Sequence, residues 1–338
     1  MSEIAKPERH LQQTEDFDYE LKRIGSDDFS VLIPLMEDCF GMDVDIDYFR
    51  WKYTQNPAGS FIGFIAADKA TGQVGGYYGV IPQIFELDGK VTKVFQSCDT
   101  MTHSKHRRRG LFRKLAMRCY QELRDEENLF VIGFGGGQST PGFLKFGWQR
   151  IFDFRYYFKP AILCRFSKGS KSAIEDVNVS TAQKAIEDGL DITKKKASAK
   201  AKSVRTSEQI NWRLSNPYHK YLALRVTNDD VSYMIFYLDK DKLVVFDVFI
   251  DNPVSGKKMM NFLSQEVLQN NFKGIISFCQ EDGRDSEVLK KLGFISNPFS
   301  FGPLNERVPF IQFSDKNRME EYLSPNDWCV TTYDHDSL

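Results

Sequence analysis

The chain has 338 residues, 41% of them hydrophobic, and its 45 basic residues are balanced by 46 acidic ones. This length favours two domains, each large enough for its own core. The balanced charge argues against a nucleic-acid-binding protein, which would carry an extended basic surface, and no apolar run approaches the roughly 20 residues of a membrane span. We therefore expect neither nucleic acid nor a membrane as a partner.

Strands and helices are predicted in alternation along the first half of the chain. Residues 1–18 are polar and are expected to form a flexible leader. The spacing of apolar residues predicts a strand at 19–24, helices at 27–40 and 47–53, and paired strands at 61–67 and 74–85. It then predicts a strand that ends near residue 102, a helix at 111–125, a short strand at 129–134 and a strand at 150–158.

The segment between the strand ending near residue 102 and the helix at 111–125 is the most informative. It contains a cationic run from His106 to Arg109, followed by Gly110. The first N–H groups of a helix have no intrahelical partner and lie at the positive end of its dipole. Gly110 has no side chain that would keep an anion away from them. The segment predicts a site for the pyrophosphate of a cofactor, with a solvated basic turn and a nucleic-acid contact as alternatives.

Arg107-x-x-Gly110 after a strand resembles the Gln/Arg-x-x-Gly-x-Gly/Ala loop that binds the coenzyme A pyrophosphate in the GNAT N-acetyltransferase superfamily. The chain departs from this motif at its last small position, which is Phe112. Phe146-Gly147-Trp148 is similar to the Leu-Gly-Phe ending of the family, and the order of elements agrees over about residues 19–160. The resemblance implies an α/β (α+β) fold with a mixed, mostly antiparallel central sheet flanked by helices.

The resemblance also implies acetyl-CoA as the co-substrate, with no metal ion. The residues expected to bind it lie in the strand end, the cationic loop and a short later helix: Met101, Thr102, His106, Arg107, Arg108, Arg109, Gly110, Leu111, Ser139 and Phe143. A backbone N–H near Met101 is expected to stabilise the oxyanion. The glycine run 135–137 is expected to border the pantetheine arm, with Ser139 as a helix cap. Phe143 stands where the family often has a tyrosine acid.

Asp99 and His103 are the candidate catalytic residues, because the family commonly takes its base from the fourth strand. An amine like that of lysine has a pKa of about 10, so a base must accept its proton. Asp99 interrupts an apolar strand, where an unused carboxylate would be costly to bury. We therefore expect Asp99 at the floor of the cleft or in a structural hydrogen bond. His103 precedes the cationic loop and has a structural role as its alternative.

The second half repeats the first in weakened form. Trp51-Lys52-Tyr53 before Asn56-Pro57 recurs as Trp212-Arg213-Leu214 before Asn216-Pro217, but no Arg-x-x-Gly follows in the second half. Such repetition indicates two tandem GNAT-like domains, of which only the first holds acetyl-CoA. The expected divisions are the domain 19–165, a linker or insert at 166–205 that is rich in Ala, Ser and Lys, and a degenerate domain at 206–338.

The C-terminal aromatic and acidic residues Trp328, Asp334 and Asp336 are candidates for binding the acceptor, with a solvated acidic tail as the alternative. The sequence as a whole predicts an N-acyltransferase that moves an acetyl group directly to a primary amine of a small soluble acceptor, such as an amino sugar. A non-catalytic acyl-CoA-binding or scaffolding protein is the alternative. The six scattered cysteines indicate reduced thiols and hence the cytoplasm. The expected assembly is a monomer or a homodimer.

Overall fold

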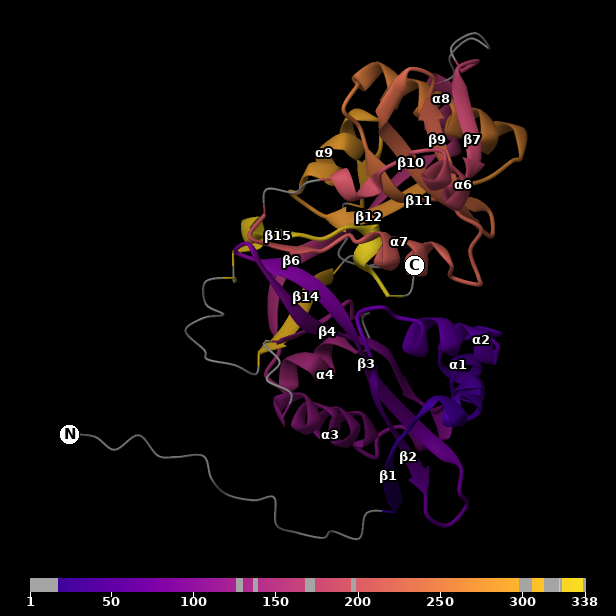
Figure 1. Cartoon of the computed structure of the whole chain (residues 1–338). Helices are drawn as coiled ribbons and strands as arrows, with labels where there is room; N and C mark the ends of the chain where they lie inside the picture. Colours follow the sequence, from indigo (N-terminus) through magenta and orange to yellow (C-terminus); the bar gives the residue numbers. More distant parts are fainter. Residues whose placement is uncertain are drawn as a thin grey trace, which may run out of the picture.

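A computed structural model describes residues 18–125, 130–135, 139–167, 174–195, 199–297, 306–312, 322 and 324–336. The leader before residue 18, residues 136–137 of the glycine run and part of the expected linker lie outside the described residues. The described strands form a mixed sheet that is mostly antiparallel, and helices flank it (Figure 1). The fold class is therefore the α/β class expected from the sequence.

The first half contributes five neighbouring strands, β1 to β5, to this sheet. These are β1 (Tyr19–Arg23), β2 (Ile62–Asp68), β3 (Val74–Leu87), β4 (Lys90–Thr102) and β5 (Phe130–Gly133). Neighbours pair antiparallel except β4 and β5, which are parallel. The helices are α1 (Ile33–Phe40), α2 (Ile46–Phe49), α3 (Leu111–Asp125) and α4 (Thr140–Lys145). The helix α3 buries Leu115, Cys119 and Leu123 against the sheet.

The second half shows the same order of strands. These are β7 (Val177–Thr181), β9 (Leu222–Val226), β10 (Asp229–Asp239), β11 (Lys242–Phe249) and β12 (Gly274–Gln280). Again only the last pair, β11 and β12, is parallel. The helices are α6 (Ala182–Glu187), α7 (Ser207–Leu214), α8 (Pro253–Gln269) and α9 (Arg284–Lys291). Like α3, α8 lies between the fourth and fifth strands of its half.

Two strands join the halves by crossing between them. The strand β6 (Gln149–Pro160) follows the first half in sequence, yet it pairs with β12 of the second. The strand β14 (Glu306–Gln312) follows the second half in sequence, yet it pairs with β5 of the first and with β6. The order through the junction is therefore β5-β14-β6-β12, and the ladder continues through both halves.

The segment expected to be a linker, 166–205, contains regular structure in its described part. It holds β7 and α6, which belong to the second half, and β8 (Ala201–Ser203), which pairs with β3. The strand β15 (Trp328–Cys329) then pairs with β8, so the C-terminal segment is tied to the first half. The described part of this segment is therefore built into both halves through β7, α6 and β8.

Most elements of the first half agree with the sequence to within about two residues at their ends, and the region from 27 to 54 differs. In place of one helix at 27–40, a 3-10 helix (Ser26–Leu32) precedes α1. Pro34 lacks an N–H and fits only the first turn of an α-helix, which explains why α1 begins at Ile33. The helix predicted at 47–53 is α2 followed by a π-helical turn at Arg50–Thr54. Among the described helices, none combines the length and apolar character needed to cross a membrane.

Candidate active site

A cavity of about 360 Å³ lies where β4 and β5 diverge, between α1 and α4. Its described lining comes from both helices, both strands and the C-terminal segment: Met36, Cys39, Phe40, Met42, Tyr48, Ser97, Cys98, Asp99, Thr100, Gly133, Phe134, Gly135, Ser139, Phe143 and Asp336. The cavity thus brings together Asp99, Ser139, Phe143 and Asp336, four of the residues singled out from the sequence.

The strands β4 and β5 form a fork that opens into this cavity. Their parallel pairing ends at Ser97 and Gly133, whereas β4 remains paired with β3 as far as Thr102. No described strand pairs with the other edge of β4 beyond Ser97. An edge of this kind can accept an extended ligand through main-chain hydrogen bonds. The fork is therefore suited to an extended chain such as the pantetheine arm.

Alternation along β4 determines which peptide groups face the open edge. The N–H of His103 donates to the carbonyl of Gly75 on β3 over 3.0 Å. Because peptide groups alternate in direction along an antiparallel strand, the N–H of Met101 also faces β3, and that of Thr102 faces the fork. The side chain of Met101 is buried in the core. Thr102 is therefore better placed than Met101 to donate to a ligand in the fork.

A bulge in β4 turns Asp99 toward the cavity. The register with β3 shifts between Tyr77 and Gly79, where β4 holds one extra residue, and Asp99 has the left-handed backbone angle φ 45°. Left-handed backbone is costly for a residue with a side chain and persists where the surroundings hold it in place. The contacts of the Asp99 carboxylate supply that support.

The Asp99 carboxylate belongs to a buried polar network. Lys52 Nζ lies 2.7 Å from one of its oxygens, and the Tyr53 hydroxyl donates to the other over 2.6 Å. Lys52 also reaches Asp336 at 3.1 Å and the Tyr48 oxygen at 3.2 Å. Lys52, Asp99 and Asp336 each expose 5% or less of their side chains. The sequence motif Trp51-Lys52-Tyr53 thus places two donors under the floor of the cavity.

The charge states in this network follow from burial and proximity. Burial disfavours a charged Lys52, but the neighbouring Asp99, Tyr48 and Asp336 outweigh it and raise the pKa of Lys52 above its ordinary value. Burial, followed by the Asp99 charge, raises the pKa of both Tyr48 and Tyr53. The lysine is therefore an ammonium and the two tyrosines are neutral hydroxyls at neutral pH.

The cationic loop lies at the N-terminus of α3, as the sequence predicted. Arg108 and Gly110 both have left-handed backbone, with φ 65° and 74°. Arg107, which precedes them, is extended, with φ −64° and ψ 159°. A β-carbon added at Gly110 would meet nothing within 4 Å, so the space in front of the helix is open. The start of α3 is therefore accessible to a ligand.

The side chains of the loop differ in their availability to a ligand. His106 is buried and bonded to the Tyr19 hydroxyl at 2.7 Å and to Gln73 at 3.2 Å; burial, then the charges of His103 and Arg109, lower its pKa. His106 therefore supports the loop and does not bind an anion through its ring. Arg107 donates from Nε to the Thr102 carbonyl over 3.4 Å, and Arg109 lies over the Tyr19 ring at 5.9 Å.

Phe112 fills the space between the first turns of α3 and α4. Its ring centroid lies 5.2 Å from that of Phe143 and 4.9 Å from that of Phe146. A β-carbon on Gly142 would approach the Phe112 ring to 2.5 Å, so this large residue is accommodated by a glycine in α4. Ser139 occupies the N-cap position of α4, but its side chain makes no capping hydrogen bond, in contrast to expectation.

The remaining candidates lie outside the cavity. The His103 ring accepts from the N–H of Lys105 at 3.2 Å and lies 4.0 Å from Asp38, beyond the end of β4. Trp328 is buried against Phe85 and Phe130 and donates to the carbonyl of Tyr322 over 2.7 Å, so it is a core residue. The structure therefore does not bring His103 or Trp328 together with Asp99.

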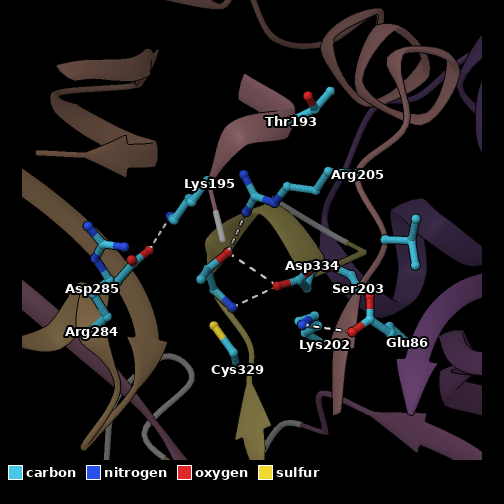
Figure 2. A pocket seen from close by; sticks show the side chains of 12 residues that line it. Glu86, Thr193, Lys195, Lys202, Ser203, Arg205, Arg284, Asp285, Cys329 and Asp334 are labelled. Atoms are coloured by element: carbon cyan, nitrogen blue, oxygen red, sulfur yellow. Dashed lines mark hydrogen bonds and ion pairs between the residues drawn. The ribbon is translucent and has the colours of Figure 1, made fainter. Parts of the chain in front are cut away.

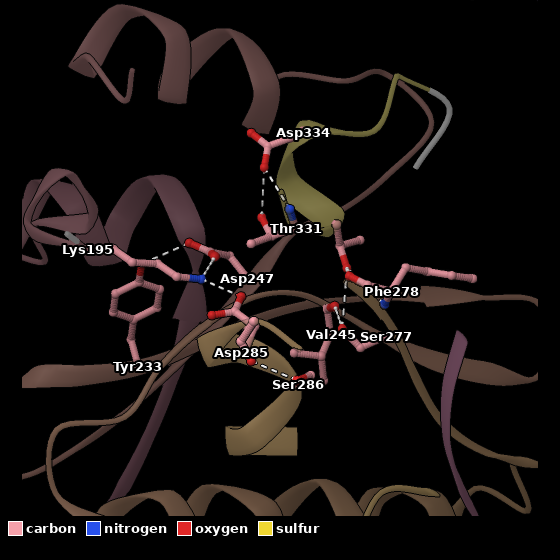
Figure 3. A network of polar contacts seen from close by, with 12 residues as sticks. Lys195, Tyr233, Val245, Asp247, Ser277, Phe278, Asp285, Ser286, Thr331 and Asp334 are labelled. Carbon is pink, nitrogen blue, oxygen red and sulfur yellow. Dashed lines mark hydrogen bonds and ion pairs between the residues drawn. The ribbon is translucent and has the colours of Figure 1, made fainter. Parts of the chain in front are cut away.

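Asp334 lines a different cavity, of about 350 Å³, whose lining comes from the second half, from β8 and from Glu86 of β3 (Figure 2). There it accepts from the N–H of Thr331 over 2.8 Å and from the Ser203 hydroxyl. Nearby, Lys195 bridges Asp247 at 2.7 Å and Asp285 at 2.6 Å (Figures 2 and 3). Burial opposes the charge of Asp247, yet Arg205 and Lys195 outweigh it and lower the pKa of Asp247. The charges of Lys195, Asp247 and Arg205 are therefore neutralised within the protein.

The N-terminus of α8 differs from that of α3. The Asn252 side chain accepts from the N–H of Val254 over 2.9 Å. The carboxylate of Asp229 accepts from the N–H groups of Val231 and Ser232, and its pKa is lowered by these bonds although burial opposes the shift. An asparagine and an acid thus occupy the region that three arginines occupy in the first half. This arrangement does not favour a bound pyrophosphate.

Lys52, Tyr53 and Tyr48 were not identified as site residues from the sequence. Trp51-Lys52-Tyr53 was noted as part of the repeat, and Lys52 was not singled out because lysine is ordinarily exposed. No pattern in the sequence pointed to Tyr48 as a site residue either. Within the part of the chain that the structure describes, no group of three or more His, Cys, Asp or Glu residues is arranged to hold a metal ion.

Comparison with known proteins finds a family model that matches part of the first half. Residues 20–151 match the family model described as an acetyltransferase (GNAT) domain. This part of the chain is thus similar to GNAT acetyltransferase domains, in line with its loop, fork and strand order. No protein with a curated description matches the sequence.

Three solved structures share the fold of most of the chain. A conserved protein of unknown function from Enterococcus faecalis V583, named "Probable N-Acyltransferase", is 9% identical, with a TM-score of 0.63. GCN5-related N-acetyltransferases from Anabaena variabilis ATCC 29413 and Kribbella flavida are 12% and 10% identical, with TM-scores of 0.58 and 0.55. The matches cover 87%, 87% and 88% of this chain and 73%, 73% and 72% of the others, in the same order. At these identities the likeness concerns the fold.

Proposed function

We propose that this protein is an acetyl-CoA-dependent N-acyltransferase that transfers an acetyl group directly to a primary amine of a small acceptor. The observation that carries the proposal is the alignment of three features along β4. These are the cationic loop at the N-terminus of α3, the open edge of the fork, and the cavity that contains Asp99. Together they match the phosphate, the extended arm and the reacting end of acetyl-CoA.

Main-chain groups of the loop would hold the pyrophosphate, with Arg107, Arg108 and Arg109 supplying positive charge. The open edge at Thr100–Thr102 would bond the pantetheine arm in the manner of an added strand. Ser139 and Phe143 line the cavity beside that edge. The thioester would then lie next to Asp99, with the N–H of Thr102 near the carbonyl oxygen.

The amine must lose two protons and the departing thiolate must gain one. The acceptor arrives as an ammonium and loses one proton to Asp99, directly or through a water molecule, so that its nitrogen can attack the carbonyl carbon. A C–N bond forms and the C–S bond breaks; the thiolate takes the hydroxyl proton of Tyr48, and the second amine proton restores that hydroxyl, directly or through water. Phe143 cannot donate a proton. Tyr48 lines the cavity and accepts from Lys52, so its own proton remains to be donated to the thiolate.

We propose that the second half is a degenerate GNAT-like unit that binds no acetyl-CoA. The strand order β7-β9-β10-β11-β12 with its single parallel pair supports a duplication. The altered N-terminus of α8 supports the loss of the cofactor site. In this proposal the second unit begins near residue 174. Its C-terminal segment supplies Asp336 to the cavity of the first unit.

A non-catalytic acyl-CoA-binding protein is the second candidate, and Phe143 in place of an acid favours it. Titration calorimetry with acetyl-CoA, followed by a colorimetric assay of thiol release with a panel of amines, separates the two. The enzyme requires both binding and amine-dependent release. Binding without release across the panel would leave only the second candidate, and absence of binding would contradict both.

The proposed setting is the cytoplasm, as a monomer or a homodimer. The six cysteines, all described, are free thiols, which agrees with a reducing compartment. Size-exclusion chromatography with light scattering would determine the assembly.

A further inference from the structure

One wall of the catalytic cavity is apolar. Met36, Cys39 and Phe40 from α1, and Met42 from the loop after it, line this wall. Phe40 and Met42 remain 50% and 40% exposed to solvent. Large apolar side chains left exposed at the border of a cavity are typical of a surface that binds an apolar ligand group.

The floor of the same cavity is acidic. Asp99 and Asp336 both line it, and no lysine, arginine or histidine is among its described lining residues. The Lys52 ammonium lies beneath the two carboxylates, with only 1% of its side chain exposed. A ligand in the cavity therefore meets carboxylates and not the cation. This charge favours a positively charged group at the floor, such as the ammonium of an acceptor.

The apolar wall offers only weak hydrogen-bonding groups to the hydroxyl groups of a sugar. Its four side chains end in thioethers, a thiol and a phenyl ring. Placing a hydroxyl against such a surface removes its bonds to water without replacement, which is unfavourable. The polar lining residues come from other elements: Tyr48 from α2, Ser97, Asp99 and Thr100 from β4, Ser139 at the start of α4, and Asp336 from the C-terminal segment. The wall thus complements an apolar body that carries few polar groups.

We propose that the acceptor is a primary amine on an apolar alkyl or aryl body. Its ammonium would face Asp99 and Asp336, and its body would lie against Met36, Phe40 and Met42. This inference rests on the proposed N-acyltransferase function. It excludes amino sugars from the proposed class of acceptors.

A matched panel of acceptors tests the inference directly. Phenethylamine and hexylamine represent the apolar class, and glucosamine represents the amino sugars. With acetyl-CoA saturating, kcat/KM is expected to be at least about tenfold higher for the apolar amines, because an apolar pocket gains from each methylene that it buries. A kcat/KM for glucosamine equal to or above that of both apolar amines would overturn the inference and leave the proposed function in place.

Variants of the exposed wall residues provide a second test. Phe40→Ser and Met42→Ser are each expected to raise KM for phenethylamine about fivefold, with kcat and acetyl-CoA affinity unchanged. Leu238→Ser on β10 is the control, because Leu238 is 51% exposed and lies in the second half. Unchanged KM in both wall variants would overturn the inference.

Acetyl-CoA affinity, measured separately by calorimetry, distinguishes the two levels of the proposal. If the protein binds acetyl-CoA but acetylates none of the amines, both the proposed function and the inference are contradicted. If the protein binds acetyl-CoA and acetylates glucosamine alone, only the inference is contradicted.

Discussion

The indole of Trp51 donates to the carbonyl of Trp212 over 2.7 Å, and the indole of Trp212 donates to the carbonyl of Trp51 over 2.8 Å. The two rings stack with centroids 5.5 Å apart at an interplanar angle of 24°. Both residues are buried, and they occupy equivalent places in the repeated motif. The repeat that was visible in the sequence is thus a reciprocal contact between the halves.

Replacing either tryptophan by phenylalanine should destabilise the protein. Each change removes one buried hydrogen bond, which costs about 0.5–1.5 kcal/mol of the free energy of unfolding, and the Trp212 carbonyl keeps its bonds from the N–H and hydroxyl of Ser215. Because the two rings are in contact, the double variant should depart from additivity by about 0.5 kcal/mol or more. Urea unfolding of the four proteins measures this.

Trp148→Phe is the control, since its indole donates to the Tyr120 hydroxyl within the first half. The losses in the free energy of unfolding caused by Trp148→Phe and Trp212→Phe should be additive in the double variant. Strict additivity of Trp51→Phe and Trp212→Phe would contradict an energetic coupling of the pair.

Gly110→Asp should abolish the binding of acetyl-CoA. The new carboxylate would lie where the pyrophosphate is expected, and the left-handed backbone would also be strained. We expect the Kd to rise by at least about a hundredfold, or roughly 2.7 kcal/mol, in titration calorimetry. Gly89→Asp imposes similar strain, with φ 80° in the turn between β3 and β4, and should bind normally. Equal affinities for Gly110→Asp and the unaltered protein would disprove the phosphate site.

Asp99→Asn should lower kcat about a hundredfold without changing acetyl-CoA affinity, because an amide cannot take the amine proton. His103→Ala, by contrast, should lower kcat far less, since the ring lies beyond the end of β4. Steady-state assays at saturating amine and acetyl-CoA compare the two. Full activity of Asp99→Asn would remove Asp99 from the role of base.

Lys52→Met should strongly destabilise the fold. It leaves Asp99 and Asp336 buried without the ammonium between them, and breaking a buried ion pair costs about 3–5 kcal/mol. The variant Lys52→Met/Asp99→Asn should recover part of this loss, because one buried charge is removed. Urea unfolding at pH 7 tests both. A double variant less stable than Lys52→Met would show that Asp99 contributes stability in another way.

Acidification should destabilise the protein in part through His335. Burial lowers the pKa of this imidazole from its ordinary 6.5 to about 4. Below pH 6.5 the unfolded chain binds a proton that the folded protein does not. Stability from this residue is therefore complete above pH 6.5 and declines as the pH falls toward 4, by up to about 3 kcal/mol.

His335→Phe isolates this contribution, because it keeps the ring contacts with Phe134 and Phe154. The free energy of unfolding should depend less steeply on pH between 6.5 and 4 in this variant. His219, whose pKa burial also lowers to about 4, is present in both proteins and cancels in the comparison. Identical slopes would contradict a neutral His335 in the fold.

The sequence predicted local elements well where a single pattern determined them. The helix at 111–125 has an uninterrupted amphipathic pattern, and α3 has the same bounds. The cost of burying a carboxylate pointed to Asp99, which lines the cavity. Pro34 was overlooked as a helix start, so the helix predicted at 27–40 was too long.

The features that the sequence did not reveal depend on contacts between distant residues. Lys52 was overlooked because lysine is ordinarily exposed, and its partner Asp336 lies 284 positions away. Trp328 was interpreted as a ligand residue, yet it fills the core beside Phe85. The pairing of β14 with β5 has no local signal, since a short apolar strand can pair with any open edge.

The crossing of β6 and β14 has a consequence for any attempt to dissect the molecule. A fragment that stops before residue 174 would carry β6 without its partner β12 and would expose the flank of β5 on which β14 belongs. Bare edges of this kind promote aggregation. When the same fragment is co-expressed with the remainder of the chain, the two fragments should associate and remain in solution. Each fragment carries a strand that pairs with the other: β6 in the first and β14 in the second.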